Sequence, residues 1–93
     1  MTVGVSHTHG GNVVVVDMDS GARWDMTPDM AELAAETCDR IGARDIDRGI
    51  VALNALEGRI FKYHGKPGDF RAMAQDLRHH AKEGRAKCQP AAR

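Results

Sequence analysis

The sequence has few of the residue types from which large cores and stacking sites are built. Only four of its 93 residues are aromatic, namely Trp24, Phe61, Tyr63 and Phe70. The core must therefore consist mainly of Val, Ile, Leu, Met and Ala. A chain of this length also lacks the residues for a cofactor domain beside a substrate domain. We expect a single small domain.

Long apolar runs and paired cysteines are also missing. No wholly apolar run is longer than the four residues of 13–16, far fewer than the roughly 20 residues that cross a bilayer. The N-terminal stretch MTVGVSHTHGG lacks the basic start and apolar segment of a secretory signal. A disulfide between Cys38 and Cys88, the only two cysteines, has no support from their context. These absences favour a cytoplasmic protein without a membrane segment.

Signatures of catalysis are absent too. The sequence contains no nucleophile elbow, no phosphate-binding loop and no dinucleotide-binding fingerprint. Asp17 and Asp19 resemble the beginning of a calcium loop, but the position that requires a bidentate Glu is Pro28. We therefore expect no enzymatic activity and no cofactor.

Two histidines near the N-terminus are further candidate metal ligands that stand close together. In SHTHGG (residues 6–11), His7 and His9 would project to the same side of an extended segment. Two imidazoles are half of a closed zinc shell, and the rest would have to come from His64, His79, His80 or a cysteine. The two glycines that follow are typical of a turn. We interpret the segment as a hairpin loop with incidental histidines, and predict no metal site.

Strand signals dominate the N-terminal third. Residues 12–18 contain four consecutive valines and are predicted to form a strand. Residues 19–21 (DSG) are typical of a hairpin turn, and residues 22–26 would return antiparallel. Residues 2–6 alternate apolar with small side chains and would add a third strand, joined through residues 7–11.

Helical spacing predicts three helices after these strands. The first covers residues 28–41, with Thr27 as its N-cap and Pro28 in its first turn. Its apolar face is predicted from Met30, Leu33, Ala34, Thr37, Cys38 and Ile41. The second covers residues 45–64, on the spacing of Ile46, Ile50, Leu53, Leu56 and Ile60. This apolar arc is wide enough for more than one neighbour, and a homodimer would cover it.

The third helix is predicted over residues 69–83. Asp69 is its cap, and its apolar face is formed by Phe70, Met73, Ala74, Leu77 and Ala81. Residues 84–93 are predicted to be a flexible basic tail. The fold class is thus α+β: a small single domain over residues 1–93, with an N-terminal antiparallel β-hairpin or three-stranded meander followed by three α-helices.

The net charge is zero, but the charges are segregated along the chain. Residues 1–58 hold 4 basic and 10 acidic side chains, whereas residues 59–93 hold 9 basic and 3 acidic ones. The first helix would carry an acidic stripe formed by Asp29, Glu32, Glu36 and Asp39. The third would carry a basic face formed by Arg71, Arg78, His79, Lys82 and Arg85. Either the two halves attract each other, or these faces bind a partner.

A small domain with segregated charge and no catalytic motif is typical of proteins that act by binding. We expect a non-enzymatic interaction module, an inhibitor or adaptor that docks on a larger protein or nucleoprotein complex through a charged helix face. In size and charge layout it is similar to phage- or mobile-element-encoded factors such as anti-CRISPR inhibitors, although no motif links it to them. The alternative is an accessory protein that binds nucleic acid without sequence preference through the basic helix. That helix lacks interleaved aromatic residues for base stacking.

Overall fold

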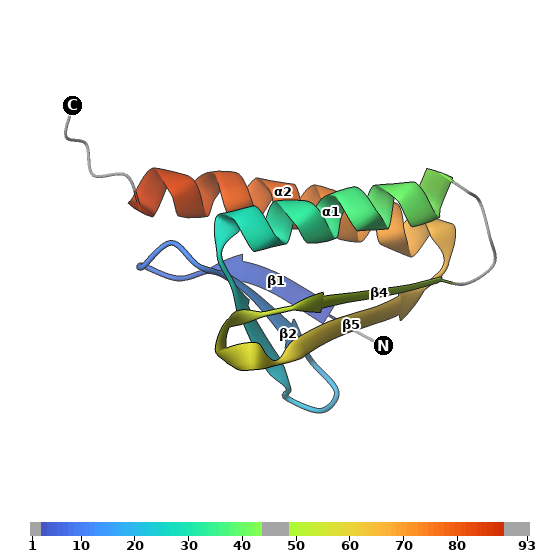
Figure 1. The fold of residues 1–93 in the computed structure, drawn as a ribbon, viewed down its shortest axis with the longest axis horizontal. Helices are drawn as coiled ribbons and strands as arrows, with labels where there is room; N and C mark the ends of the chain where they lie inside the picture. The colour runs from blue at the N-terminus through green and yellow to red at the C-terminus, as the bar shows by residue number, and fades with distance from the viewer. Residues whose placement is uncertain (1–2, 44–48, 89–93) are drawn as a thin grey trace.

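The computed structural model describes residues 3–43 and 49–88, which form an α+β arrangement (Figure 1). The elements in chain order are β1 (Val3–His7), β2 (Val13–Asp17), β3 (Arg23–Met26), α1 (Pro28–Ala43), β4 (Gly49–Asn54), the 3-10 helix η1 (Leu56–Gly58), β5 (Ile60–Gly65) and α2 (Pro67–Cys88). The two helices lie side by side in one layer, and the strands lie on one side of that layer. Neither helix of the described part has the length and apolar character of a membrane span.

The predicted three-stranded meander is confirmed. β2 lies between β1 and β3, antiparallel to both, with Val15 opposite Val5 on one side and Trp24 on the other. The turn after β2 requires Gly21, whose φ of 78° lies in the left-handed region. Four consecutive β-branched residues thus occupy the central strand, where two neighbouring strands satisfy their backbone groups.

The predicted helix over residues 45–64 is wrong. Residues 49–65 form a second antiparallel sheet instead, in which β4 pairs with β5 and Leu53 lies opposite Phe61. Phe61 and Tyr63 are buried while Lys62 between them is exposed, which is the period of two that a strand requires. Gly58 takes a φ of 73° just before β5, a conformation that interrupts a helix. The expected start of the helix, in residues 45–48, lies outside the described residues.

The first predicted helix is confirmed, but its buried face differs from the expected one. Thr27 caps α1, since its Oγ1 accepts a hydrogen bond from the Met30 amide at 3.2 Å. The buried positions of α1 are Ala31, Ala34, Ala35, Cys38 and Gly42. Leu33, predicted to be buried, is 56% exposed. Small side chains let α1 approach α2 closely, and this turns Leu33 outward.

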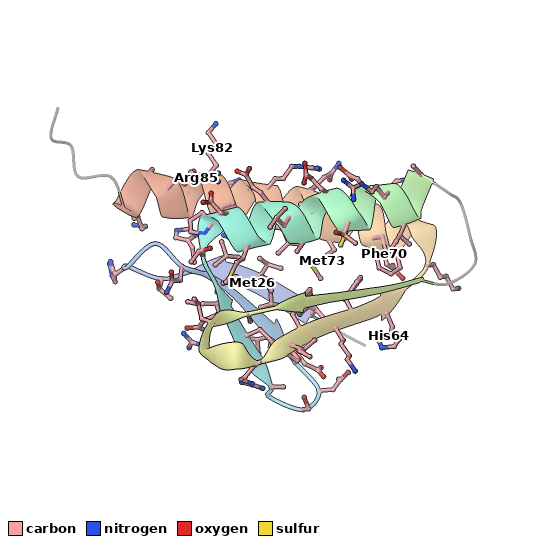
Figure 2. All side chains as sticks on the ribbon, in the orientation of Figure 1. Met26, His64, Phe70, Met73, Lys82 and Arg85 are labelled. Atoms are coloured by element: carbon pink, nitrogen blue, oxygen red, sulfur yellow. The ribbon has the colours of Figure 1, made fainter. Side chains whose placement is uncertain are left out.

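The third predicted helix is longer than expected. α2 runs from Pro67 to Cys88, so the assignment of residues 84–88 to a flexible tail is wrong, while residues 89–93 lie outside the described part. The reason is tertiary, because Gly84 is buried where α2 packs on the loop between β1 and β2. The predicted apolar face is confirmed: Phe70, Met73, Ala74, Leu77 and Ala81 are all buried. Figure 2 shows Phe70 and Met73 pointing toward the strands.

The four aromatic residues form one continuous cluster in the core. Phe61 lies between Trp24 and Tyr63, at ring-centroid distances of 5.6 and 6.5 Å. Tyr63 in turn packs against Phe70 in a T-shaped contact, with the ring centroids 5.2 Å apart. The cluster therefore connects β3, β5 and α2. Cys38, on the buried face of α1, is a free thiol. Burial is the main cause that raises its pKa to about 12, so the thiol is not a reactive nucleophile.

Candidate binding surface

The arginines predicted on the basic face of α2 lie along α1. Arg71, Arg78 and Arg85 recur every seven residues, so they occupy one edge of the helix. Arg71 Nη2 donates a hydrogen bond to the backbone carbonyl of Gly42 at 2.7 Å, at the C-terminal end of α1. One heptad further on, Arg78 Nη1 lies 2.5 Å from Asp39 Oδ2. The positive edge of α2 thus follows α1 from its end toward its start.

Arg85 completes this contact at the start of α1 (Figure 2). Its Nη2 lies 2.6 Å from Asp29 Oδ1, and its Nη1 also donates to Glu32. These ion pairs are largely exposed, so each contributes only about 0–1 kcal/mol to stability. Three of the four predicted acidic residues therefore form ion pairs with two of the five predicted basic ones, while Arg71 contacts a backbone carbonyl. This pairing agrees with the interpretation that the two oppositely charged halves attract each other.

The remaining predicted residues point outward from the helix layer. Glu36 is exposed on α1, and His79 and Lys82 are exposed on α2, where Figure 2 shows Lys82 directed away from the strands. Within residues 3–43 and 49–88, neither Glu36 nor Lys82 forms an ion pair. The exposed Leu33 lies three residues before Glu36 and hence on the same outward face of α1. This face combines a large apolar side chain with an unpaired carboxylate.

A depression lies between β3 and η1, on a part of the chain that sequence reasoning did not single out. Arg23, Asp25, Leu56 and Arg59 line it, and its volume is about 290 Å³. The Arg59 guanidinium lies 5.5 Å from the Trp24 ring centroid and donates to the Arg23 carbonyl. The Asp25 carboxylate is bound by Arg23 at 2.7 Å. Two arginine side chains, one carboxylate and one leucine thus line the depression.

The structure separates the two histidines of SHTHGG. His7 is the last residue of β1 and is half-buried, whereas His9 is exposed in the turn. His7 Nδ1 lies 2.9 Å from His80 Nδ1 on α2, and the rings of His79 and His80 are 4.9 Å apart. The interpretation of His7 as an incidental loop residue is therefore wrong. In the described part of the chain, no three His, Cys, Asp or Glu side chains are arranged to hold a metal ion.

The pKa of His80 lies below its ordinary value of 6.5. Burial is the largest cause, and the neighbouring His79 and His7 act in the same direction, against the opposing effect of Asp76 and Glu83. A contact between two Nδ1 atoms needs a proton on one ring and a lone pair on the other. Folding therefore disfavours the protonated form of His80.

This shift predicts a loss of stability in mild acid. Since the unfolded chain binds a proton at His80 more readily than the folded chain, the free energy of unfolding should fall as the pH drops below about 6.5. Urea denaturation between about pH 7.5 and 5.5 measures the effect. His80→Gln should flatten the profile, whereas His64→Gln, at an exposed position on β5, should leave it unchanged. A profile equally steep in His80→Gln would contradict the assignment.

Comparison with known proteins adds no further constraint. No protein-family model, no curated protein and no solved structure matches this chain. The function must therefore be argued from the residues that the structure leaves exposed and from those that it brings together.

Proposed function

We propose that this protein is a non-enzymatic protein-binding module, a small inhibitor or adaptor, which docks on a larger protein or nucleoprotein complex through the outward face of α1. The observation that carries the proposal is the 56% exposure of Leu33 in the middle of that helix. Burying a leucine side chain contributes about 1.5–3 kcal/mol, so a partner that covers Leu33 gains a substantial term.

The surroundings of Leu33 define the chemistry of the partner. Glu36 lies one turn after Leu33 and is exposed without an ion pair in the described part of the chain. Asp29 lies one turn before it and remains 87% exposed despite its contact with Arg85. Protein interfaces commonly place an apolar centre inside a polar rim. The complementary partner surface is an apolar pocket with a basic rim.

The alternative, binding of nucleic acid through α2, has less support. Arg71, Arg78 and Arg85 all donate to groups on α1. Of the predicted basic face, only His79 and Lys82 are left to contact phosphates. Nonspecific binding to nucleic acid requires several cationic contacts, because each one releases counterions from the phosphate backbone. Most cationic side chains of the predicted basic face on α2 already contact α1, so few remain to bind phosphates.

The double substitution Leu33→Arg with Glu36→Lys tests the proposed surface. It should leave the fold intact, because both side chains are exposed, and should weaken binding to the physiological partner by more than tenfold. The partner is identified by cross-linking and mass spectrometry with the wild-type protein, purified, and titrated against each variant. A tenfold loss of affinity corresponds to about 1.4 kcal/mol. Lys82→Glu is the matched control on α2 and should bind within about twofold of the wild type, because Lys82 lies outside the proposed surface.

Two results would overturn this proposal. One is a partner that binds the double variant as tightly as the wild type. The other is a complex with DNA or RNA that weakens steeply and log-linearly with salt and is lost in Lys82→Glu, which would establish the nucleic-acid alternative.

A further inference from the structure

Two imidazole nitrogens meet where α2 packs on β1. His7 ends a strand that is held in register by its pairing with β2, opposite Val13. His80 lies within the 22-residue helix α2. Their Nδ1 atoms are 2.9 Å apart although 73 residues separate them in the chain. One turn after His80, Gly84 packs on Gly11 in the loop between β1 and β2. The position of α2 over this loop is therefore closely constrained.

The separation of the two nitrogens matches one particular coordination geometry. Metal–imidazole bonds are about 2.0–2.1 Å long, so two nitrogens at a right angle about an ion lie about 2.9 Å apart. A tetrahedral angle would place them about 3.4 Å apart. Right angles between neighbouring ligands are typical of tetragonal Cu²⁺ and Ni²⁺ sites rather than of structural zinc sites. The observed 2.9 Å, the length of a hydrogen bond between the two rings, equals the first of these separations.

We infer that His7 and His80 form a two-histidine site for a tetragonal divalent transition-metal ion, with Nδ1 of each ring as a ligand and water in the remaining positions. The proton that one Nδ1 holds in the metal-free contact moves to Nε2 of the same ring, so both lone pairs become available without a net loss of protons. Nickel and copper favour imidazole nitrogen as a ligand. The bound ion connects β1 to α2.

The charges around the site are compatible with a bound cation. Asp76 and Glu83, both on α2, favour a positive charge at His80, whereas His79 and His7 oppose protonation there.

Isothermal titration of the untagged protein with NiCl₂ tests the site. Cys88 is first replaced by Ser, because thiols compete for soft metals. We expect one Ni²⁺ per chain, at least tenfold weaker binding in both His7→Ala and His80→Gln, and no change in His64→Ala. Ni²⁺ should raise the melting temperature of the parent but not that of the His7 and His80 variants, because a ligand that binds only the folded state stabilises it. With CuCl₂, electron paramagnetic resonance should show two equivalent nitrogen ligands.

A local site at the N-terminus would give a different pattern. If His7 and His9 bound the ion together, His9→Ala would abolish binding, His80→Gln would not, and binding would survive in concentrated urea. Binding that is independent of His80 in a variant with wild-type circular dichroism would overturn the inference. So would a Ni²⁺ stoichiometry well below one per chain for the folded parent protein.

Discussion

Replacing Phe61 by alanine is expected to lower the free energy of unfolding by about 3–5 kcal/mol. The Phe61 side chain is 1% exposed and lies between Trp24 and Tyr63, so it joins β5 to β3. A domain of this size has a total stability of roughly 5–14 kcal/mol. Loss of one ring should therefore remove a large fraction of that stability. Urea denaturation, followed by far-UV circular dichroism and by the fluorescence of the single tryptophan, measures it.

Substitutions at the next two residues, Lys62 and Tyr63, provide the control and show which result would contradict the assignment of this segment to a strand. Lys62→Ala removes an exposed side chain and should change stability by less than about 0.5 kcal/mol. Tyr63 is 8% exposed, and Tyr63→Ala should again cost more than about 2 kcal/mol. Large effects at two positions that flank a neutral one are the signature of a strand. Equal effects at all three positions, or a large effect at Lys62 alone, would contradict the hairpin.

The second large effect is expected at Gly84. In an exposed helix, Gly→Ala is stabilising by up to about 1 kcal/mol. A Cβ at Gly84, however, would overlap the carbonyl oxygen of Gly11, lie 3.1 Å from the carbonyl carbon of that residue and also approach Pro28. Backbone atoms cannot rotate away as a side chain can, so α2 must move off the loop. We expect Gly84→Ala to destabilise the protein by at least about 2 kcal/mol.

Gly68 is a matched control in the first turn of the same helix. A Cβ at Gly68 meets nothing within 4 Å, so Gly68→Ala should be neutral or slightly stabilising. Thermal denaturation of the two variants at equal concentration makes the comparison. A Gly84→Ala protein as stable as Gly68→Ala would show that α2 does not pack closely on the β1–β2 loop.

The meander, the start of α1 and the buried face of α2 follow from signals local to the sequence. The four valines of residues 13–16 and the glycine turn predict β2 and its reversal into β3. Thr27 and Pro28 predict the start of α1, because capping and a fixed φ act within a single turn of helix. The spacing of apolar residues in α2 is regular enough to define its face. In each of these, neighbouring residues supply the stabilising interactions.

Residues 49–65 show where a local pattern is ambiguous. Their apolar residues are dense enough to satisfy both a helical period and a strand period, and Ile60 was assigned to a buried stripe although it is 52% exposed. The alternation of Phe61, Lys62 and Tyr63 was the signal that favoured a strand. Pairing with β4, and contact with the Trp24 ring, select the hairpin. Such contacts outweigh helical propensity.

The sequence alone was sufficient to predict the meander, the start of α1 and the buried face of α2, which depend on interactions between neighbouring residues. It also showed that the two halves of the chain carry opposite charge. It could not specify which of those charges remain exposed, because Arg78 and Asp39, or Arg85 and Asp29, meet only after two helices pack antiparallel. The outward position of Leu33 likewise depends on which face of α1 the small residues bring against α2. The contact between His7 and His80 spans 73 residues. No local pattern encodes it, because only the packing of α2 on β1 brings the two rings together.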